Sequence, residues 1–487
     1  METTYLACTG ACETIRVVVL SLVLFASLTG GFAYTTWLER RFIAIIQARV
    51  GPNRAGPAGL LQPIADGIKL VFKEDITPSQ ADKVVFWLAP VITVMPALPV
   101  LGVVPLAPSI PIWIAGNWYV IPFALVDVNV GVLYVLAITS IAVYGVTLAG
   151  WASANKYSML GGIRASAQMV SYELSLGLGV AVPIMIAGTM SFGKIVDAQF
   201  DLGWFILHNP LAAFILLVAL LAEVNRAPFD LPEAEQELTA GYHTEYSGMK
   251  FALFFMAEYI KMAVVSVVAF SLFFGGFGGP LVDSDYATGQ VALTNTTGAT
   301  VLVQRGTLVH NATDDPERRV IFETMQDVSI PAGATAIVGV DATTRTPGLL
   351  GNVPAGTLTM VEGVSGVSAT NPEPTAGGGQ EFVFGPLLGI GYLLGKVVAA
   401  LLTMVWIRAT FPRFRYDQLM SFGWKVMLPL ALLAAAWTAT ALVLSDEAGG
   451  NPDVYWVIQF LLTGAIVGII FIAFVASVVR RRRQLAT

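Results

Sequence analysis

The chain consists of long apolar stretches joined by short polar connections. A helix needs about 20 apolar residues to cross the hydrocarbon layer of a membrane, and several windows approach that length, some of them interrupted by Gly, Pro or one ionisable residue. We place these windows near residues 15–37, 84–105, 126–148, 173–188, 210–222, 251–275, 386–407, 426–444 and 454–479. The fifth window is short and is expected to extend past Glu223. The pattern predicts an all-α polytopic membrane protein with about nine transmembrane helices.

Composition supports this fold class and excludes several functions. Of the 487 residues, 55% are hydrophobic and only 12% are charged, and the mean hydropathy is +0.71. The net charge of −6 leaves no basic excess for binding nucleic acid. Three histidines and the two cysteines, Cys8 and Cys12, are too few to ligate an iron–sulfur cluster or a structural zinc ion. We therefore expect no metal site, and any redox cofactor should lie on a partner. The state of the cysteine pair is left open.

Lysine and arginine residues are concentrated in alternate connections between the apolar windows. The first, third, fifth and seventh connections, together with the tail at 480–483, hold most of the 27 basic residues. Cytoplasmic loops of membrane proteins retain positive charge. We therefore expect a multi-pass protein of a prokaryotic inner membrane, with its N-terminus outside and its C-terminus in the cytoplasm.

Residues 281–380 interrupt the membrane pattern. Thr, Val, Gly and Pro dominate there, polar and apolar residues alternate in 336–340 and 357–361, and Pro-Ala-Gly turns follow at Pro331 and Pro354. We predict a small all-β extracytoplasmic insert between membrane domains at 1–280 and 381–487. Segments 329–334 and 351–357 resemble phage baseplate J-like β segments. A neutral surface insertion is favoured over an adhesive or assembly role, and the insert's partner is unknown.

The connection after the first window combines charge with a high density of Gly and Pro. It lacks the G-K-[ST] ending of a phosphate-binding loop, so no nucleotide site is indicated. Beyond it, Leu61, Ile64, Ile68 and Phe72 fall on one helical face and Asp66 on the other. This pattern predicts a helix lying in the membrane interface. Such a helix would either admit an amphipathic, lipid-soluble ligand to a polar site or simply anchor the chain.

The connection after the fifth window is strongly acidic. Six carboxylates accompany the single Arg226: Glu223, Asp230, Glu233, Glu235, Glu237 and Glu245. Because Pro, Phe and Leu residues are interleaved with them, we expect some acids to be partly buried and to titrate as a coupled group. A solvated acidic loop is the alternative.

Ionisable residues also occur inside the apolar windows. Each costs roughly 2.5–3.5 kcal/mol in hydrocarbon, so it should face a cavity or a partner. Glu258 and Lys261 are three residues apart and can pair on one helical face, while Glu173 opens the fourth window. A static buried pair is possible, but with Glu223 and Glu173 as neighbours these residues also suit a hydrated proton route.

Blocks at 39–57, 150–157, 171–173, 223–247 and 406–425, in this order, carry a family resemblance. The chain resembles the H subunit of respiratory complex I, the proton-pumping NADH:quinone oxidoreductase, whose mitochondrial counterpart is NADH dehydrogenase subunit 1. The resemblance spans nearly the whole chain apart from the insert. The insert and the ninth window, which only some members share, depart from the family pattern.

This resemblance implies a membrane subunit that builds the quinone chamber beside an iron–sulfur cluster of a neighbour and links quinone reduction to proton translocation. The implied chamber residues are Glu39, Arg40, Arg41, Gln47, Arg49, Arg54, Asp66, Glu233, Glu235 and Glu237. The implied proton route comprises Glu173, Glu223, Arg226, Glu245, Glu258 and Lys261. Quinone would be the substrate, while FMN and iron–sulfur clusters would lie on partner subunits. Those partners would be the peripheral-arm quinone-module subunits and the antiporter-like membrane subunits, and the chain itself would contact membrane lipid.

Two other classes remain as alternatives. One is a secondary transporter with an outside adhesion domain, because spans containing Gly, Pro and buried charge also suit substrate pathways. The chain shows no convincing internal repeat of the kind that such transporters have. The other is the homologous subunit of a membrane-bound hydrogenase or of a ferredoxin- or F420-dependent complex. Only the electron-input subunits would separate this last class from a quinone reductase.

Overall fold

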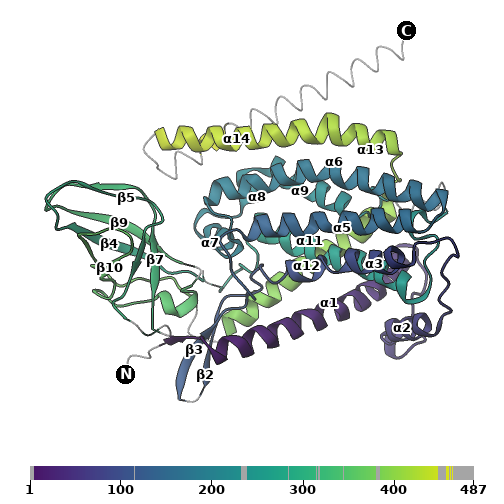
Figure 1. Cartoon of the computed structure of the whole chain (residues 1–487), viewed down its shortest axis with the longest axis horizontal. Helices are drawn as coiled ribbons and strands as arrows, with labels where there is room; N and C mark the ends of the chain where they lie inside the picture. Colours follow the sequence, from purple (N-terminus) through teal and green to yellow (C-terminus); the bar gives the residue numbers. More distant parts are fainter. Residues whose placement is uncertain are drawn as a thin grey trace, which may run out of the picture.

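The computed structural model of the chain combines a helical membrane body with a separate β region (Figure 1). It describes residues 5–114, 116–231, 239–282, 285–313, 315, 318–343, 345–379 and 384–447, together with 457–459, 461 and 463. Within these residues, seven helices are long and apolar enough to cross a membrane. The protein is therefore a multi-pass membrane protein.

The helical body is built from long apolar helices in chain order. They are α1 (Ala11–Ile46), α3 (Lys83–Val94) continued by α4 (Ala97–Val100), α5 (Gly131–Ala152), α6 (Lys156–Ala187), α9 (Pro210–Glu223), α11 (Gly248–Phe273), α12 (Phe384–Thr410), and α13 (Tyr416–Phe422) joined through the π-helical turn η4 (Gly423–Met427) to α14 (Leu428–Glu447). Helix α9, with 14 residues, is the short member. Helix α6 packs against α5, α9 and α14, so it lies at the centre of the body.

Eight of the nine predicted windows coincide with helices, but two details were wrong. The fourth helix starts at Lys156, so Glu173 lies within α6 and does not open it. Hydropathy missed the first half of α6 because several of its side chains are polar, among them the buried Gln168, which donates to the carbonyls of Ala222 and Phe229. Helix α9 ends at Glu223 and does not extend past it, because the backbone turns there and Asn225 adopts a positive φ of 59°. The ninth window lies almost entirely outside the described residues.

Short elements connect the long helices. The helix predicted after the first connection is present as α2 (Gln62–Phe72), preceded by the turn η1 (Pro57–Gly59). Between α6 and α9 lie α7 (Phe192–Leu202) and α8 (Phe205–His208), and η2 (Gly241–His243) precedes α11.

The β region has its own hydrophobic core. An antiparallel sheet has the order β10-β6-β7-β9-β4-β11, and β5 pairs with β8. The strands are β4 (Thr288–Asn295), β5 (Val301–Val303), β6 (Leu308–His310), β7 (Ile321–Thr324), β8 (Val328–Ile330), β9 (Thr335–Ala342), β10 (Met360–Val361) and β11 (Val367–Thr370). The predicted strand at 336–340 lies in β9. The one predicted at 357–361 is reduced to the two residues of β10, because Leu358 leaves the sheet pattern to pack into the core.

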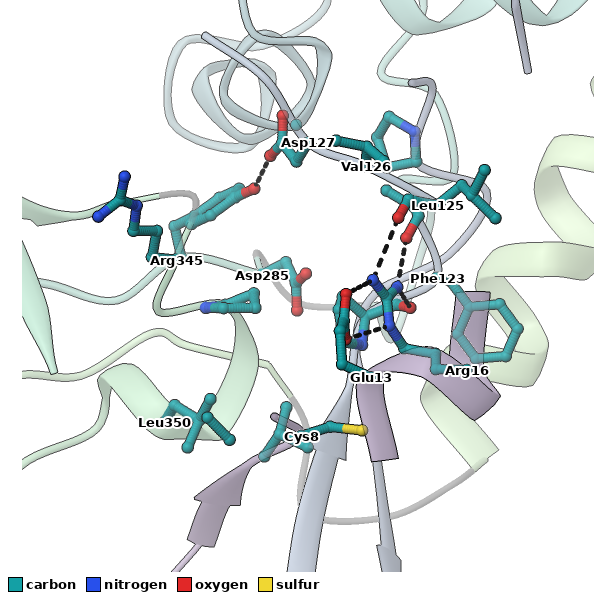
Figure 2. A pocket seen from close by; sticks show the side chains of 18 of the residues that line it. Cys8, Glu13, Arg16, Phe123, Leu125, Val126, Asp127, Asp285, Arg345 and Leu350 are labelled. Carbon is teal, nitrogen blue, oxygen red and sulfur yellow. Dashed lines mark hydrogen bonds and ion pairs between the residues drawn. The ribbon is translucent and has the colours of Figure 1, made fainter. Parts of the chain in front are cut away.

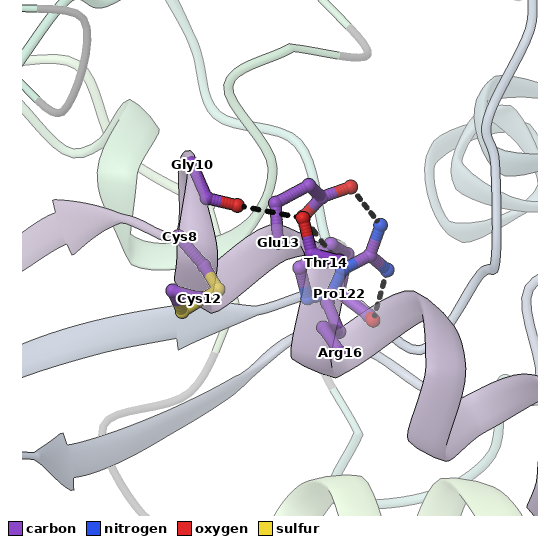
Figure 3. The surroundings of a disulfide bond; sticks show 7 residues. All are labelled: Cys8, Gly10, Cys12, Glu13, Thr14, Arg16 and Pro122. Carbon is purple, nitrogen blue, oxygen red and sulfur yellow. Dashed lines mark hydrogen bonds and ion pairs between the residues drawn. A yellow bond between two sulfur atoms is a disulfide. The ribbon is translucent and has the colours of Figure 1, made fainter.

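The β region docks on a small N-terminal sheet. In this sheet β1 (Tyr5–Ala7) pairs in parallel with β3 (Asn117–Ile121), which pairs in turn with β2 (Ile110–Ile114). The 3-10 turn η3 (Gly348–Gly351) places Leu349 and Leu350 against Val120. A disulfide between Cys8 and Cys12 ties β1 to the first turn of α1 (Figure 3). The β region is therefore held against the same end of the body as the start of α1.

The seam between the β region and the helical body contains buried polar contacts. A cavity of about 530 Å³ lies in the seam, bordered by Cys8, Asp127 and Asp285 (Figure 2). The Tyr286 hydroxyl donates to Asp127, and both the backbone N–H and the hydroxyl of Ser109 donate to Asp285 at 2.9 Å. Burial raises the pKa of Asp285 to about 7, against the hydrogen bonds from Ser109. The seam is thus a specific interface.

Lys194 of α7 supplies a buried cation to this seam. Its ammonium pairs with Glu323 and lies 3.5 Å from Asp341, and the lysine side chain is only 10% exposed. Lys194→Met would remove the cation that Glu323 and Asp341 share, which should weaken docking by up to about 3 kcal/mol. Limited proteolysis should then cut the seam faster than in the wild type. Arg318→Met removes the exposed Arg318–Asp315 pair and is the control, since such pairs contribute about 0–1 kcal/mol. Equal cleavage of the two variants would contradict this prediction.

Candidate functional site

A buried arginine joins three helices at one end of the helical body. Arg226 follows α9, is 3% exposed, and pairs with Glu39 of α1 at 2.9 Å. It also pairs with Glu258 of α11, and its guanidinium carbon lies 4.5 Å from the centroid of the Tyr259 ring. Because removal of one partner would leave an uncompensated buried charge, these residues hold one another in place.

Arg408 connects this buried group to the surface. It lies in the last turn of α12 and pairs with the same Oε1 of Glu39 that Arg226 contacts. Glu39, Gln47 and Arg408 line one polar pocket at the end of α1. Glu39 Oε2 and Arg226 Nη2 are both buried, and Tyr259 is the neighbouring side chain that can hydrogen-bond to Glu39 and Arg226. The pocket thus gives a polar path to a buried carboxylate.

A second ion pair lies deeper along α11. The Lys261 ammonium is 3.9 Å from Glu223 at the end of α9, and both side chains are nearly buried. Lys261 is also close enough to Glu258 for the two charges to interact. We predicted a Glu258–Lys261 pair on one helical face. The ion-pair partners of these residues are instead Arg226 and Glu223, because the end of α9 and the loop after it bring both to that face. Lys261 therefore connects the Arg226 group to Glu223.

Glu173 extends this series of charges into the middle of α6. It accepts a hydrogen bond from Ser140 of α5. Glu173 and Glu223 line the same small cavity, whose other walls are mainly Val and Leu side chains from α5, α6, α9 and α11, together with Phe192 of α7. The charges thus form a series, which we call the buried charge chain: Arg408, Glu39, Arg226, Glu258, Lys261, Glu223 and Glu173.

The charged residues of the first connection lie at the surface end of this chain. Arg40 pairs with Asp66 of α2 at 2.6 Å, and Asp66 also accepts from Gln62 at 3.0 Å. Arg49 donates to Gln47 at 2.6 Å. The Arg40–Asp66 pair attaches α2 to the end of α1, close to the pocket lined by Glu39. The Arg49–Gln47 hydrogen bond lies within the loop that joins the two helices.

Two other arginines of this connection have less specific surroundings. The Arg41 guanidinium carbon lies 5.6 Å from the centroid of the Trp37 ring, and its Nη1 donates to the carbonyl of Pro52 at 3.3 Å. Arg54 is exposed on the loop. Helix α2 leaves Ile64, Ile68 and Phe72 exposed, as expected of a helix that lies in the membrane interface.

The acidic connection is only partly described. Glu233, Glu235 and Glu237 lie outside the described residues. Glu245 accepts from Asn155 at 2.6 Å and lines a separate polar pocket between the α5–α6 turn and the loop at 78–80. The structure therefore brings Glu223, Arg226 and Glu258 together and places Glu245 at another surface.

Asp230 is a further buried acid beside the Arg226 group. It pairs with Arg413 at 2.5 Å. Burial raises the pKa of Asp230 to about 6; Arg413 opposes this shift and the charge of Glu258 adds to it. Neither Arg408, Arg413 nor Asp230 was among the predicted site residues. Arg408 and Arg413 were visible in the sequence only as basic residues of one connection and as members of the 406–425 block, because no local spacing relates them to Glu39 or Asp230 across more than 180 residues.

His243 in η2 is buried between aromatic rings. The ring centroids of Tyr242 and Phe251 lie 4.9 and 5.4 Å from its imidazole. Burial lowers the pKa of His243 from 6.5 to about 4. Since the folded pKa is the lower one, stability is full above pH 6.5 and is lost as the pH falls towards about 4.

Replacement of His243 by phenylalanine should remove this acid sensitivity. The variant keeps a ring between Tyr242 and Phe251 but has no group to protonate. Its thermal midpoint in detergent should change less than that of the wild type between about pH 6.5 and 4. An equal loss of midpoint in both proteins would assign the acid sensitivity to other groups.

The fold and the buried charge chain define a class: a multi-pass membrane protein with ionisable groups inside its helical body. The sequence model described as NADH dehydrogenase matches residues 19–314 and 356–439. An H subunit of the NADH-quinone oxidoreductase of Geobacter sulfurreducens is 38% identical over 426 residues, which are 86% of this chain and 92% of that protein. NADH-quinone oxidoreductase subunit 8 of Rhodothermus marinus is 40% identical over 400 residues, 81% of this chain and 88% of that protein.

The chain belongs to the family of H subunits of NADH-quinone oxidoreductase. It is therefore a membrane subunit of complex I, and other subunits of that complex are its partners. A second sequence model, described as a baseplate J-like protein barrel domain, matches residues 290–378. That match covers nearly all of the β region, more than the short segments that carried the resemblance in the sequence.

Proposed function

We propose that this subunit forms part of the chamber in which quinone is reduced and passes the resulting charge change into the membrane. The observation that carries the proposal is the buried charge chain, which runs from the pocket lined by Gln47 and Arg408 to Glu173 within α6. Five helices (α1, α6, α9, α11 and α12) and the loop after α9 contribute to it. A structural ion pair needs two residues, whereas a series of alternating charges can transmit a change from one end to the other.

The surface residues around this pocket are suited to admit an amphipathic substrate. Exposed apolar side chains of α2 can lie in the membrane interface. Arg40, which pairs with Asp66 of α2, places a positively charged group beside this helix. We propose that Arg41, Gln47, Arg49 and Arg54 contribute to the chamber wall with them. Glu233, Glu235 and Glu237 belong to the same proposal on sequence grounds.

Reduction of a quinone by two electrons creates negative charge that is balanced by uptake of two protons. In a low-dielectric site this charge raises the proton affinity of nearby carboxylates. Glu39 is the first buried carboxylate reached from the pocket, and Arg226 holds it next to Glu258. When one carboxylate binds a proton, it loses its negative charge. The arginine or lysine beside it then interacts more strongly with the next carboxylate in the series. Charge then shifts stepwise through Lys261 and Glu223 towards Glu173.

The electron carriers and the topology belong to the same proposal. FMN and iron–sulfur clusters would lie on partner subunits, with the quinone as substrate. We place the N-terminus outside and the C-terminus in the cytoplasm, because the basic connections gather at one side. The Cys8–Cys12 disulfide supports this orientation, since disulfides persist in oxidising compartments. The β region would then be extracytoplasmic.

Glu258→Gln tests the proposal in the assembled complex. Glu39 still pairs with Arg226 in this variant, so we expect assembly to be intact. Proton-translocating quinone reductase activity should fall roughly tenfold or more, because the glutamine cannot accept a proton. Glu235→Gln should act in the same direction. Glu373→Gln, an exposed position of the β region, is the control and should leave activity unchanged. Unchanged proton translocation in both the Glu258 and the Glu235 variant would refute the proposal.

A further inference from the structure

The β2–β3 hairpin exposes an apolar surface with an unusual arrangement. Residues 110–121 contain no charged side chain. Ile112, Trp113 and Ile114 are 41%, 57% and 41% exposed, although all three lie in a strand. Trp113 is paired directly with Trp118, and their rings meet edge to face with centroids 5.4 Å apart.

Both faces of this hairpin carry exposed apolar side chains near its tip, and the uncharged Asn117, which is paired with Ile114, is the polar residue among them. Successive side chains of a strand point to opposite faces. Trp113 and Trp118 therefore share one face, while Ile112 and Ile114 share the other with Tyr119, the partner of Ile112. A hairpin that docks on one protein surface needs only one apolar face. A tip that has apolar side chains on both faces and no charge can instead be surrounded by lipid.

The root of the hairpin is fixed to the helical body. Val120 is buried against Leu349 and Leu350 of η3, and Ile110 is buried as well. Strand β1 pairs with β3 and is tied to α1 by the Cys8–Cys12 disulfide. The hairpin is thus held at a set angle, and its tip extends crosswise to α1 and beyond it (Figure 1).

The position of the hairpin along α1 matches a membrane surface. Strand β1 ends at Ala7 and α1 begins at Ala11, so the sheet lies at the N-terminal end of this span. The first turns of α1 expose Ile15, Val18 and Leu22. A hairpin that leaves the N-terminal end of α1 crosswise to this helix runs along the boundary between lipid and water.

We propose that the tip of the β2–β3 hairpin lies in the lipid interface at the N-terminal end of α1 and anchors this end of the protein there. Tryptophan and tyrosine side chains concentrate at that depth because their rings are apolar and their N–H or O–H groups reach polar headgroups. The isoleucines on the opposite face enter the acyl region. The η3 turn of the β region packs against Val120 at the root of the hairpin and supports it there. This role does not depend on the quinone site.

Photo-cross-linking in native membranes tests the assignment. A benzophenone amino acid is placed at Trp113 in one variant of the assembled complex and at Ile114 in another, so that both faces are probed. Immersion predicts that each variant gains the mass of one phospholipid after irradiation. The same probe at Ile337, an exposed isoleucine of β9, is the control and should give no phospholipid adduct.

Three results would overturn the proposal. Cross-links from either tip position to another polypeptide would mean that the hairpin is a protein contact. Absence of phospholipid adducts at both tip positions would place the tip in water. Phospholipid adducts at Ile337 as frequent as those at Trp113 would show that the reaction does not report immersion of the tip.

Discussion

Arg226→Met should prevent the assembled subunit from accumulating in the membrane. The change removes the cation between Glu39 and Glu258, so that Glu258 loses this ion pair and Glu39 keeps only the pair with the partly exposed Arg408. The loss of one partner of a buried ion pair costs about 3–5 kcal/mol, a large part of the usual stability of about 5–15 kcal/mol. The quantity to measure is the amount of this chain in purified complex relative to wild type.

A neutral version of the same group separates stability from function. The triple variant Glu39→Gln, Arg226→Met, Glu258→Gln contains no unpaired buried charge at these positions, and Arg408 can turn towards solvent. It should therefore restore assembly, because buried ion pairs can often be replaced by neutral groups without loss of stability. Proton translocation should remain absent. If the triple variant both assembles and pumps normally, the Arg226 group is structural only.

Lys261→Met and Glu223→Gln should each lower proton-translocating quinone reductase activity by roughly tenfold or more. Lys261 is the cation between the Arg226 group and Glu223, and without it Glu223 faces an apolar cavity that also contains Glu173. Glu223→Gln removes the proton acceptor itself. Because the two residues act in one step, the double variant should be about as active as either single variant.

Lys250→Met is the matched control for this pair. Lys250 is also a buried lysine of α11, but it pairs with Asp75 at 3.0 Å and lies over the rings of Phe86 and Trp87, away from the buried charge chain. Its replacement should affect stability more than activity per assembled complex. Independent, multiplicative losses in the Lys261 and Glu223 variants, or an equal loss in Lys250→Met, would contradict a shared step.

The sequence was sufficient for the parts of the fold that depend on local patterns. Hydropathy located α1, α11 and α12, and the amphipathic repeat located α2, because both signals are carried by neighbouring residues. The start of α6 was missed because hydropathy measures average polarity. It cannot distinguish an exposed polar residue from one like Gln168, which donates to carbonyls inside the protein.

The sequence predicted several residues of the candidate site but not which of them form ion pairs. In-span charge singled out Glu258 and Lys261, since such residues are costly unless they have a partner. Their partners could not be assigned, because Arg226 and Glu39 are separated by 187 residues and meet only when α1, α9 and α11 pack together. The same holds for Arg408, which is separated from Glu39 by 369 residues. Spacing along α11 favoured a Glu258–Lys261 pair, whereas helix packing gives Glu258 and Lys261 partners from other parts of the chain.

The proposed function requires that carboxylates of the buried charge chain change protonation when quinone is reduced. Infrared difference spectra of the assembled complex, before and after reduction, report this change through the carbonyl band of protonated carboxylic acids. We predict such a band in the wild type and its loss or shift in the Glu223→Gln, Glu258→Gln and Glu173→Gln variants. A band that is the same in all three variants as in the wild type would contradict the account.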